Sequence, residues 1–148
     1  MRNKTGYFCV LLLLGVFIFK VQPGFSRTSE PDSNSAKSLN NIAVAAVEDN
    51  ETSKISEIAG KAPWYLIFDE TGVFLKSIEN PAQSSRRDSS SIVINLLLKE
   101  SCKTAIAGEF GRKMQNQLKT NKIEYYERQG IAKSVVQKFV SAQQTKEQ

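Results

Sequence analysis

The feature that most constrains the fold is an almost unbroken apolar run, NIAVAAV, at residues 41–47. A strand with one face in water alternates polar and apolar side chains, whereas a strand buried on both faces is apolar at successive positions. The run therefore predicts a central strand inside a sheet that has helices packed against it. A chain that begins its folded part in this way is expected to form a layered domain.

Seven further elements are predicted from apolar spacing and turn residues. The short turn ETG joins the second and third strands as an antiparallel hairpin, whereas helices that connect later strands require parallel pairing. The order β-β-β-α-β-α-β-α predicts an α/β fold, a ribonuclease H-like mixed five-stranded sheet with three helices. The further strands are expected at 64–69, 73–80, 103–111 and 122–127, and the helices from Asp88 or Ser89 to about Glu100, at 112–121 and at 131–143.

The first 26 residues have the pattern of a secretory signal peptide. Arg2 and Lys4 precede an apolar run of 13 residues, and the small residues Gly24 and Ser26 follow it. This run is shorter than the roughly 20 residues that a membrane-spanning helix needs. We therefore predict an exported protein, periplasmic or secreted, that meets the membrane only through this signal. The alternative is a protein anchored in the membrane by the uncleaved segment.

The rest of the chain divides by composition. Residues 27–39 are rich in Ser, Asn, Asp and Pro and predict a disordered linker. The folded domain is expected at 40–142, followed by a disordered tail at 143–148. Signal cleavage would remove Cys9 and leave Cys102 as the single cysteine. Cys102 is then a small buried residue or a reactive thiol, and it cannot form an internal disulfide or a four-thiolate zinc site.

Composition argues against catalysis and against nucleic-acid binding. The chain has no histidine, so histidine bases and histidine metal ligands are excluded. The net charge of +5 includes three basic residues of the signal, which leaves 17 basic against 15 acidic residues, or +2. A charge this small is no footprint for nucleic acid. A metal-dependent nuclease of this shape needs acidic side chains on the first strand, and residues 41–47 contain none. We expect a protein that is not an enzyme.

Two glycine-containing turns form the candidate site. One precedes the second strand, and the other closes the fourth strand just before a helix. In the predicted order the first and fourth strands are neighbours, so the loops that leave their carboxyl ends would frame a crevice. The free N–H groups and the dipole of the following helix favour an anion there. The alternative is that these residues serve only as turns. The predicted binding residues are Gly60, Lys61, Gly108, Glu109, Phe110, Gly111 and Arg112.

The stretches IAVAAVED, SEIAGKAPWYLIFDETG and AIAGEFGRKMQNQLKTNKIEYY resemble the dinitrogenase iron–molybdenum cofactor biosynthesis family over residues 41–142. In that family the loop before the second strand reads Ser-x-His-Phe-Gly-x-Ala-x-x-Phe. Gly60 and Ala62 match this pattern, whereas Ile58 stands at the position of the histidine. The chain is therefore identified as an exported, divergent member that lacks the loop histidine.

The resemblance implies a non-enzymatic domain that carries a nitrogenase-type metallocluster. An iron–sulfur or iron–molybdenum species is the implied cofactor, although isoleucine has no lone pair to offer to iron. Two functions stay open. The first is a binding domain that holds a small anion or a metallocluster. The second is an interaction module that keeps the fold and contacts another protein of the envelope without a cofactor.

Overall fold

The structure is a computed structural model that describes residues 40–85 and 87–145. The predicted signal peptide at 1–26 and the linker at 27–39 lie outside the described residues. Within the part of the chain that is described, no helix is both long and apolar enough to cross a membrane.

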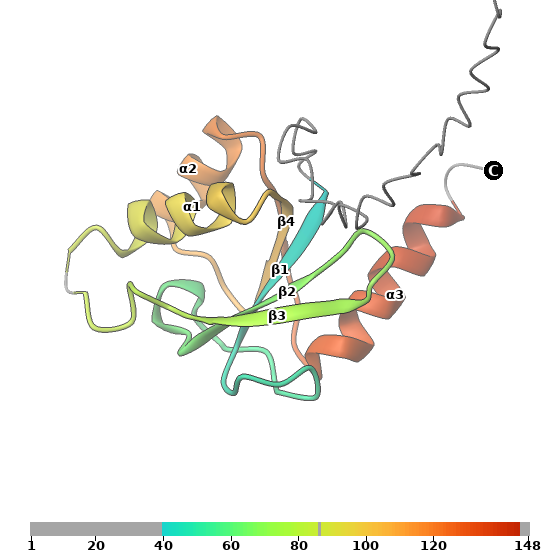
Figure 1. The fold of residues 1–148 in the computed structure, drawn as a ribbon. Helices are drawn as coiled ribbons and strands as arrows, with labels where there is room; N and C mark the ends of the chain where they lie inside the picture. The colour runs from blue at the N-terminus through green and yellow to red at the C-terminus, as the bar shows by residue number, and fades with distance from the viewer. Residues whose placement is uncertain (1–39, 86, 146–148) are drawn as a thin grey trace, which may run out of the picture. The chain divides into compact units, whose positions relative to one another are not determined.

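Five strands form one mixed sheet with the spatial order β3-β2-β1-β4-β5 (Figure 1). β2 pairs antiparallel with both β1 and β3, whereas β4 pairs parallel with both β1 and β5. This topology confirms the predicted α/β fold, including the hairpin and the adjacency of the first and fourth strands. The strands are β1 (Asn41–Ala46), β2 (Trp64–Phe68), β3 (Phe74–Glu79), β4 (Cys102–Ala107) and β5 (Glu124–Glu127).

Helices cover both faces of this sheet. α1 (Ser89–Lys99) and α2 (Arg112–Thr120) pack on one face, and α3 (Ala132–Gln144) packs on the other, as Figure 1 shows. Residues 42–46 of β1 contribute alternately to the two cores, and each is at most 3% exposed. The prediction of a first strand buried on both faces is therefore confirmed. α3 continues to Gln144, two residues past the expected end of the domain.

The two central strands present small side chains to α1 and α2. β1 supplies Ala43 and Ala45 to this core, and β4 supplies Ala105 and Ala107. Protein interiors pack at the density of organic crystals, so the room beside these alanines must be filled from other elements. The large residues that fill it are Tyr65, Leu97 and Phe110.

A strap, residues 53–61, turns back over the carboxyl ends of β1 and β4. The Ser56 N–H donates to the Ala45 carbonyl at 2.9 Å, and the Ser56 carbonyl accepts from the Gly108 N–H at 2.9 Å. The backbone of residue 108 is thus bonded to the strap and not to a neighbouring strand. For this reason β4 ends at Ala107, whereas the sequence predicted a strand that continued to residue 111.

The strap ends in a short 3-10 turn, η1 (Ala59–Lys61), beside the turn that follows β4. The Ala59 N–H donates to the Glu109 carbonyl at 3.0 Å. The approach of the two backbones requires glycine, because a Cβ on Gly108 would lie 2.7 Å from both Cα and the carbonyl oxygen of Glu57. Real Cβ atoms do not come this close to backbone atoms, so a side chain at residue 108 would displace the strap.

Replacement of Gly108 by serine tests this approach. We expect Gly108→Ser to lower the free energy of unfolding by about 1–3 kcal/mol, because the new side chain overpacks the contact. Urea denaturation measures the change. Gly111→Ser is the matched control, since a Cβ there meets nothing within 4 Å and serine is a favoured N-cap residue. Equal stabilities of the two variants would contradict the role assigned to Gly108.

Candidate functional site

A groove of about 300 Å³ lies among η1, the start of α1 and the start of α2. It opens beyond the carboxyl ends of β1 and β4, where neighbouring parallel strands were expected to frame a crevice. Three chain segments that are far apart in the sequence therefore meet in one place. The lining residues are Ile58, Gly60, Lys61, Ser89, Ser90, Gly111, Arg112, Lys113 and Met114.

The structure brings four of the seven predicted binding residues to the groove, namely Gly60, Lys61, Gly111 and Arg112. The other three residues shape the wall. Gly108 and Glu109 bond to the strap through their backbones. The ring of Phe110 is only 2% exposed and packs edge-to-face on Tyr125, with 5.4 Å between the ring centroids. Ligand binding by any of the seven stays a prediction.

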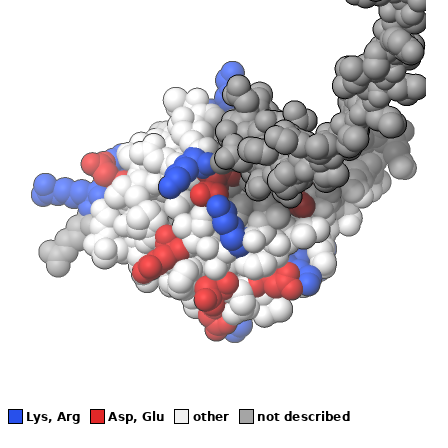
Figure 2. Space-filling view, viewed as in Figure 1, with Lys and Arg blue, Asp and Glu red and all other residues white. Residues whose placement is uncertain are grey.

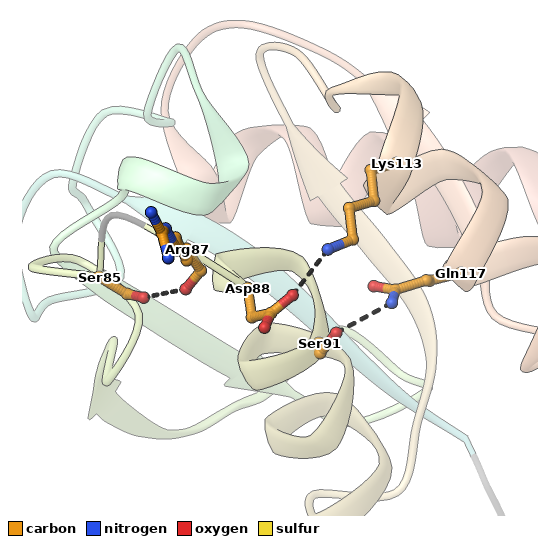
Figure 3. Close-up of polar contacts among 6 residues, drawn as sticks. All are labelled: Ser85, Arg87, Asp88, Ser91, Lys113 and Gln117. Atoms are coloured by element: carbon orange, nitrogen blue, oxygen red, sulfur yellow. Dashed lines mark hydrogen bonds and ion pairs between the residues drawn. The ribbon is translucent and has the colours of Figure 1, made fainter.

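Sequence reasoning did not include the residues that α1 contributes to the groove, or Met114 from α2. Ser89 and Ser90 were recognised as the start of a helix, but no pattern in the sequence placed that helix beside α2. In the structure Gln117 Nε2 donates to Ser91 Oγ at 3.0 Å, and this bond joins the first turn of α1 to α2 (Figure 3). A run of serines before an apolar stripe was the available signal.

The groove wall formed by η1 is held from below by a buried tyrosine. Tyr65 is 1% exposed, and its hydroxyl donates to the Ala59 carbonyl at 2.8 Å. Burial raises the pKa of the Tyr65 phenol, so the hydroxyl keeps its proton and remains a donor. Asn80 holds the other end of the turn, with Nδ2 donating to the Ala62 carbonyl at 2.7 Å. These two contacts fix the backbone that presents Gly60.

Gly60 leaves room on the groove side of η1. A Cβ at this position would meet Ser89 Oγ at 3.4 Å and the terminal methyl of Met114 at 3.6 Å. A larger side chain would therefore extend into the space between η1, α1 and α2. The sequence-based expectation that Gly60 allows a close approach to the backbone agrees with this geometry.

Positive charge and free backbone donors converge on the groove. The first residues of α1 and of α2 line the groove, so the positive ends of two helix dipoles lie there. No side chain of an N-cap residue, Asp88 for α1 or Gly111 for α2, accepts a hydrogen bond from the first turn. The first-turn N–H groups are therefore available to a ligand. Lys61, Arg112 and Lys113 add three cationic side chains. On the face shown in Figure 2 basic and acidic side chains are interspersed.

A second hollow, of about 370 Å³, lies near the amino-terminal ends of β1, β4 and β5. Its lining mixes signs of charge, because Lys103 is accompanied by Glu70 and Glu124. Such a mixture gives no preference for an anion over a cation. The groove at the opposite end of the parallel strands is therefore the better candidate for a charged ligand.

Residues 40–142 match the family described as dinitrogenase iron-molybdenum cofactor. The chain belongs to this family. The match spans all the residues that line the groove, from Ile58 to Met114. It confirms the resemblance drawn from the sequence. No curated protein matches the sequence.

Solved structures share the fold of this family member at low sequence identity. The orange protein of Desulfovibrio gigas, in its apo form, is 20% identical with a TM-score of 0.65, and the alignment covers 70% of this chain and 89% of that protein. A candidate NifB protein from Thermotoga is 18% identical with a TM-score of 0.59, covering 69% and 88%. At these identities the likeness establishes the fold alone.

The name of the dinitrogenase iron-molybdenum cofactor family implies a metal-containing ligand, and the donor atoms of this chain can be compared with that requirement. Within residues 40–85 and 87–145, no three Cys, Asp or Glu side chains lie close enough together to hold a metal ion. The groove offers serine hydroxyls and the thioether of Met114. Cys102 is completely buried at the start of β4 and does not line the groove. The lining does not fit direct bonds to iron, but it fits a negatively charged group.

Proposed function

We propose that this member of the dinitrogenase iron-molybdenum cofactor family is a non-catalytic binding domain that holds a compact, multiply charged anion in the groove. The observation that carries the proposal is the convergence of Lys61, Arg112 and Lys113 with the amino-terminal ends of two helices. An anion there gains both backbone hydrogen bonds and favourable charge. A metal–sulfur cluster that brings its own ligands belongs to this chemical class.

The proposed binding differs from conventional metal ligation. An isoleucine, Ile58, lies on the groove wall and is 50% exposed, and no imidazole exists in the chain. The protein would therefore contact the outer atoms of the ligand and leave its metal–ligand bonds unchanged. Ligands held in this way can be released intact, which suits a carrier of iron–sulfur or iron–molybdenum species better than a protein with a resident cofactor.

The exposure of the cations sets the expected strength of binding. Lys61, Arg112 and Lys113 are all exposed to solvent, so their attraction for an anion is screened by salt. Affinity should therefore fall as ionic strength rises, unlike the affinity of a site built from direct metal bonds.

The charge of the groove can be tested with tetrathiomolybdate, a compact sulfur-containing dianion whose visible absorption reports binding. We expect the purified domain to bind it, and Lys61→Met and Arg112→Met each to weaken binding by about tenfold or more, because each removes a charge-assisted contact. Lys138→Met is the matched control, since Lys138 lies on α3, which covers the opposite face of the sheet. Its affinity should equal that of the wild type.

Two results would overturn the proposal. One is that the wild-type domain does not bind the dianion at low salt. The other is that Lys138→Met weakens binding as much as Lys61→Met does. Failure to bind, together with specific association with one protein of the envelope, would favour the alternative function of an interaction module.

We propose in addition that the protein is exported. Support comes from the basic start, the apolar run of 13 residues and the small residues Gly24 and Ser26. An exported carrier would work outside the compartment in which cytoplasmic clusters are assembled, so its ligand would have to be stable there or be supplied by a partner.

Cell fractionation with amino-terminal sequencing tests export. We expect the protein outside the cytoplasm, with a mature chain that begins at Arg27. Leu13→Arg, which places a charge within the apolar run, should keep the protein inside the cell at its full length. Recovery of the uncleaved wild-type chain from the membrane fraction would support the membrane-anchored alternative and contradict cleavage.

A further inference from the structure

Asp88 has an unusual position at the edge of the groove. It is the N-cap residue of α1, and its backbone is in the left-handed region with φ at 58°. Aspartate at an N-cap ordinarily accepts hydrogen bonds from the first turn of its own helix, but the side chain of Asp88 makes no such bond. Its carboxylate points instead at α2, where Lys113 Nζ lies 2.7 Å from Oδ1 (Figure 3).

This contact places an anion of the protein on a cation of the groove. Lys113 lines the groove, and among the ion pairs of residues 40–85 and 87–145 it is the groove cation that is paired with a carboxylate. Lys61 contacts a neutral group, the Ser85 carbonyl, at 3.3 Å, and so keeps its full charge for a ligand. The hydrogen bond and charge of Lys113 hold the pKa of Asp88 below its usual value, so the carboxylate is ionised near neutral pH.

We propose that Asp88 is a built-in competitor of the ligand: it occupies Lys113 in the empty groove and must be displaced when a multiply charged anion binds. The inference rests on the proposed function of the groove. In this role Asp88 would set the affinity of the groove for its ligand. It would also favour ligands whose charge density exceeds that of a single carboxylate. Weakly charged anions would leave the Asp88–Lys113 pair in place and contact only part of the groove.

The exposure of the pair allows this exchange. The side chains of Lys113 and Asp88 are 62% and 69% exposed, and ion pairs exposed to this degree contribute little to stability. Opening the pair therefore does not require α1 to leave α2. The two helices stay joined through the Ser91–Gln117 bond and through a shared core, which includes Val93, Leu97, Met114 and Leu118.

Asp88→Asn tests the competition directly. Asparagine tolerates the left-handed backbone, and it keeps the shape of the side chain while removing its charge. We expect this variant to bind tetrathiomolybdate about two- to fivefold more tightly than the wild type, in line with the strength of an exposed ion pair. Glu57→Gln is the matched control, because it removes one negative charge from the strap next to Gly108 without touching an ion pair of Lys113. Its affinity should change by less than about 1.5-fold if the screened charge of a solvated acid is all that is lost.

The same Asp88→Asn change made in a Lys113→Met variant distinguishes competition for Lys113 from a general effect of the Asp88 charge on binding. In Lys113→Met the cation is gone, so adding Asp88→Asn should no longer tighten binding. An equal gain in both backgrounds would show that Asp88 acts only through its long-range charge and would overturn the inference. A thermal melt of each variant confirms that it is folded.

The outcomes distinguish this inference from the function on which it rests. If the wild type binds the dianion and Asp88→Asn binds no more tightly, the groove function stands and the competition is wrong. If the wild type binds and Asp88→Asn binds more tightly, the groove function and the competition are both supported. If neither binds, the proposed function is wrong and the inference is overturned with it.

Discussion

The backbone contact between the strap and the end of β4 determines how the η1 wall and the α2 wall of the groove lie relative to each other. The bonds of Gly108 to Ser56 and of Ala59 to Glu109 place η1 beside the turn that starts α2. This contact is possible because residue 108 has no Cβ, since any side chain would meet the backbone of Glu57. Without it, Lys61 and Arg112 would belong to two separate loops, and their charges would not act on one ligand.

The sequence predicted the sheet well because its strands are defined by strong local patterns. The run NIAVAAV indicated burial on two faces, which holds for residues 42–46, whereas Val47 follows the end of β1 and is 49% exposed. The short ETG turn indicated a hairpin. The same topology brought Gly60 and Lys61 near Gly111 and Arg112, since the carboxyl ends of adjacent parallel strands lie at one edge of a sheet. These parts of the site follow from strand order alone.

The remaining parts of the site depend on tertiary packing, which local patterns do not encode. The placement of α1 beside α2 arises from the shared core and from the Ser91–Gln117 bond, so the contribution of Ser89 and Ser90 could not be foreseen. A left-handed backbone at a residue other than glycine gives no signal in the sequence. The direction of the Asp88 carboxylate, toward Lys113, therefore could not be predicted either. The length of the fourth strand was overestimated because apolar spacing does not reveal a strap that captures the next two residues.

The chemistry of the groove separates the fold of this family member from the usual means of holding metal. The residues that line the groove supply cations, N–H groups and hydroxyls. They include no imidazole, thiolate or carboxylate that could bind a metal ion. Within the described residues, Cys102 is buried at the start of β4, at the other end of that strand from the groove. Recognition of a ligand by this groove would therefore depend on charge and on backbone donors.

The most direct measurement of this central claim is a backbone amide NMR titration of the purified protein with tetrathiomolybdate at low salt. The account predicts that the largest shifts occur at the amides of Gly60, Ser90, Arg112 and Lys113, and that added salt reverses them. Shifts centred instead on Lys103, Thr104 and Glu124, in the hollow at the opposite end of the parallel strands, would contradict it.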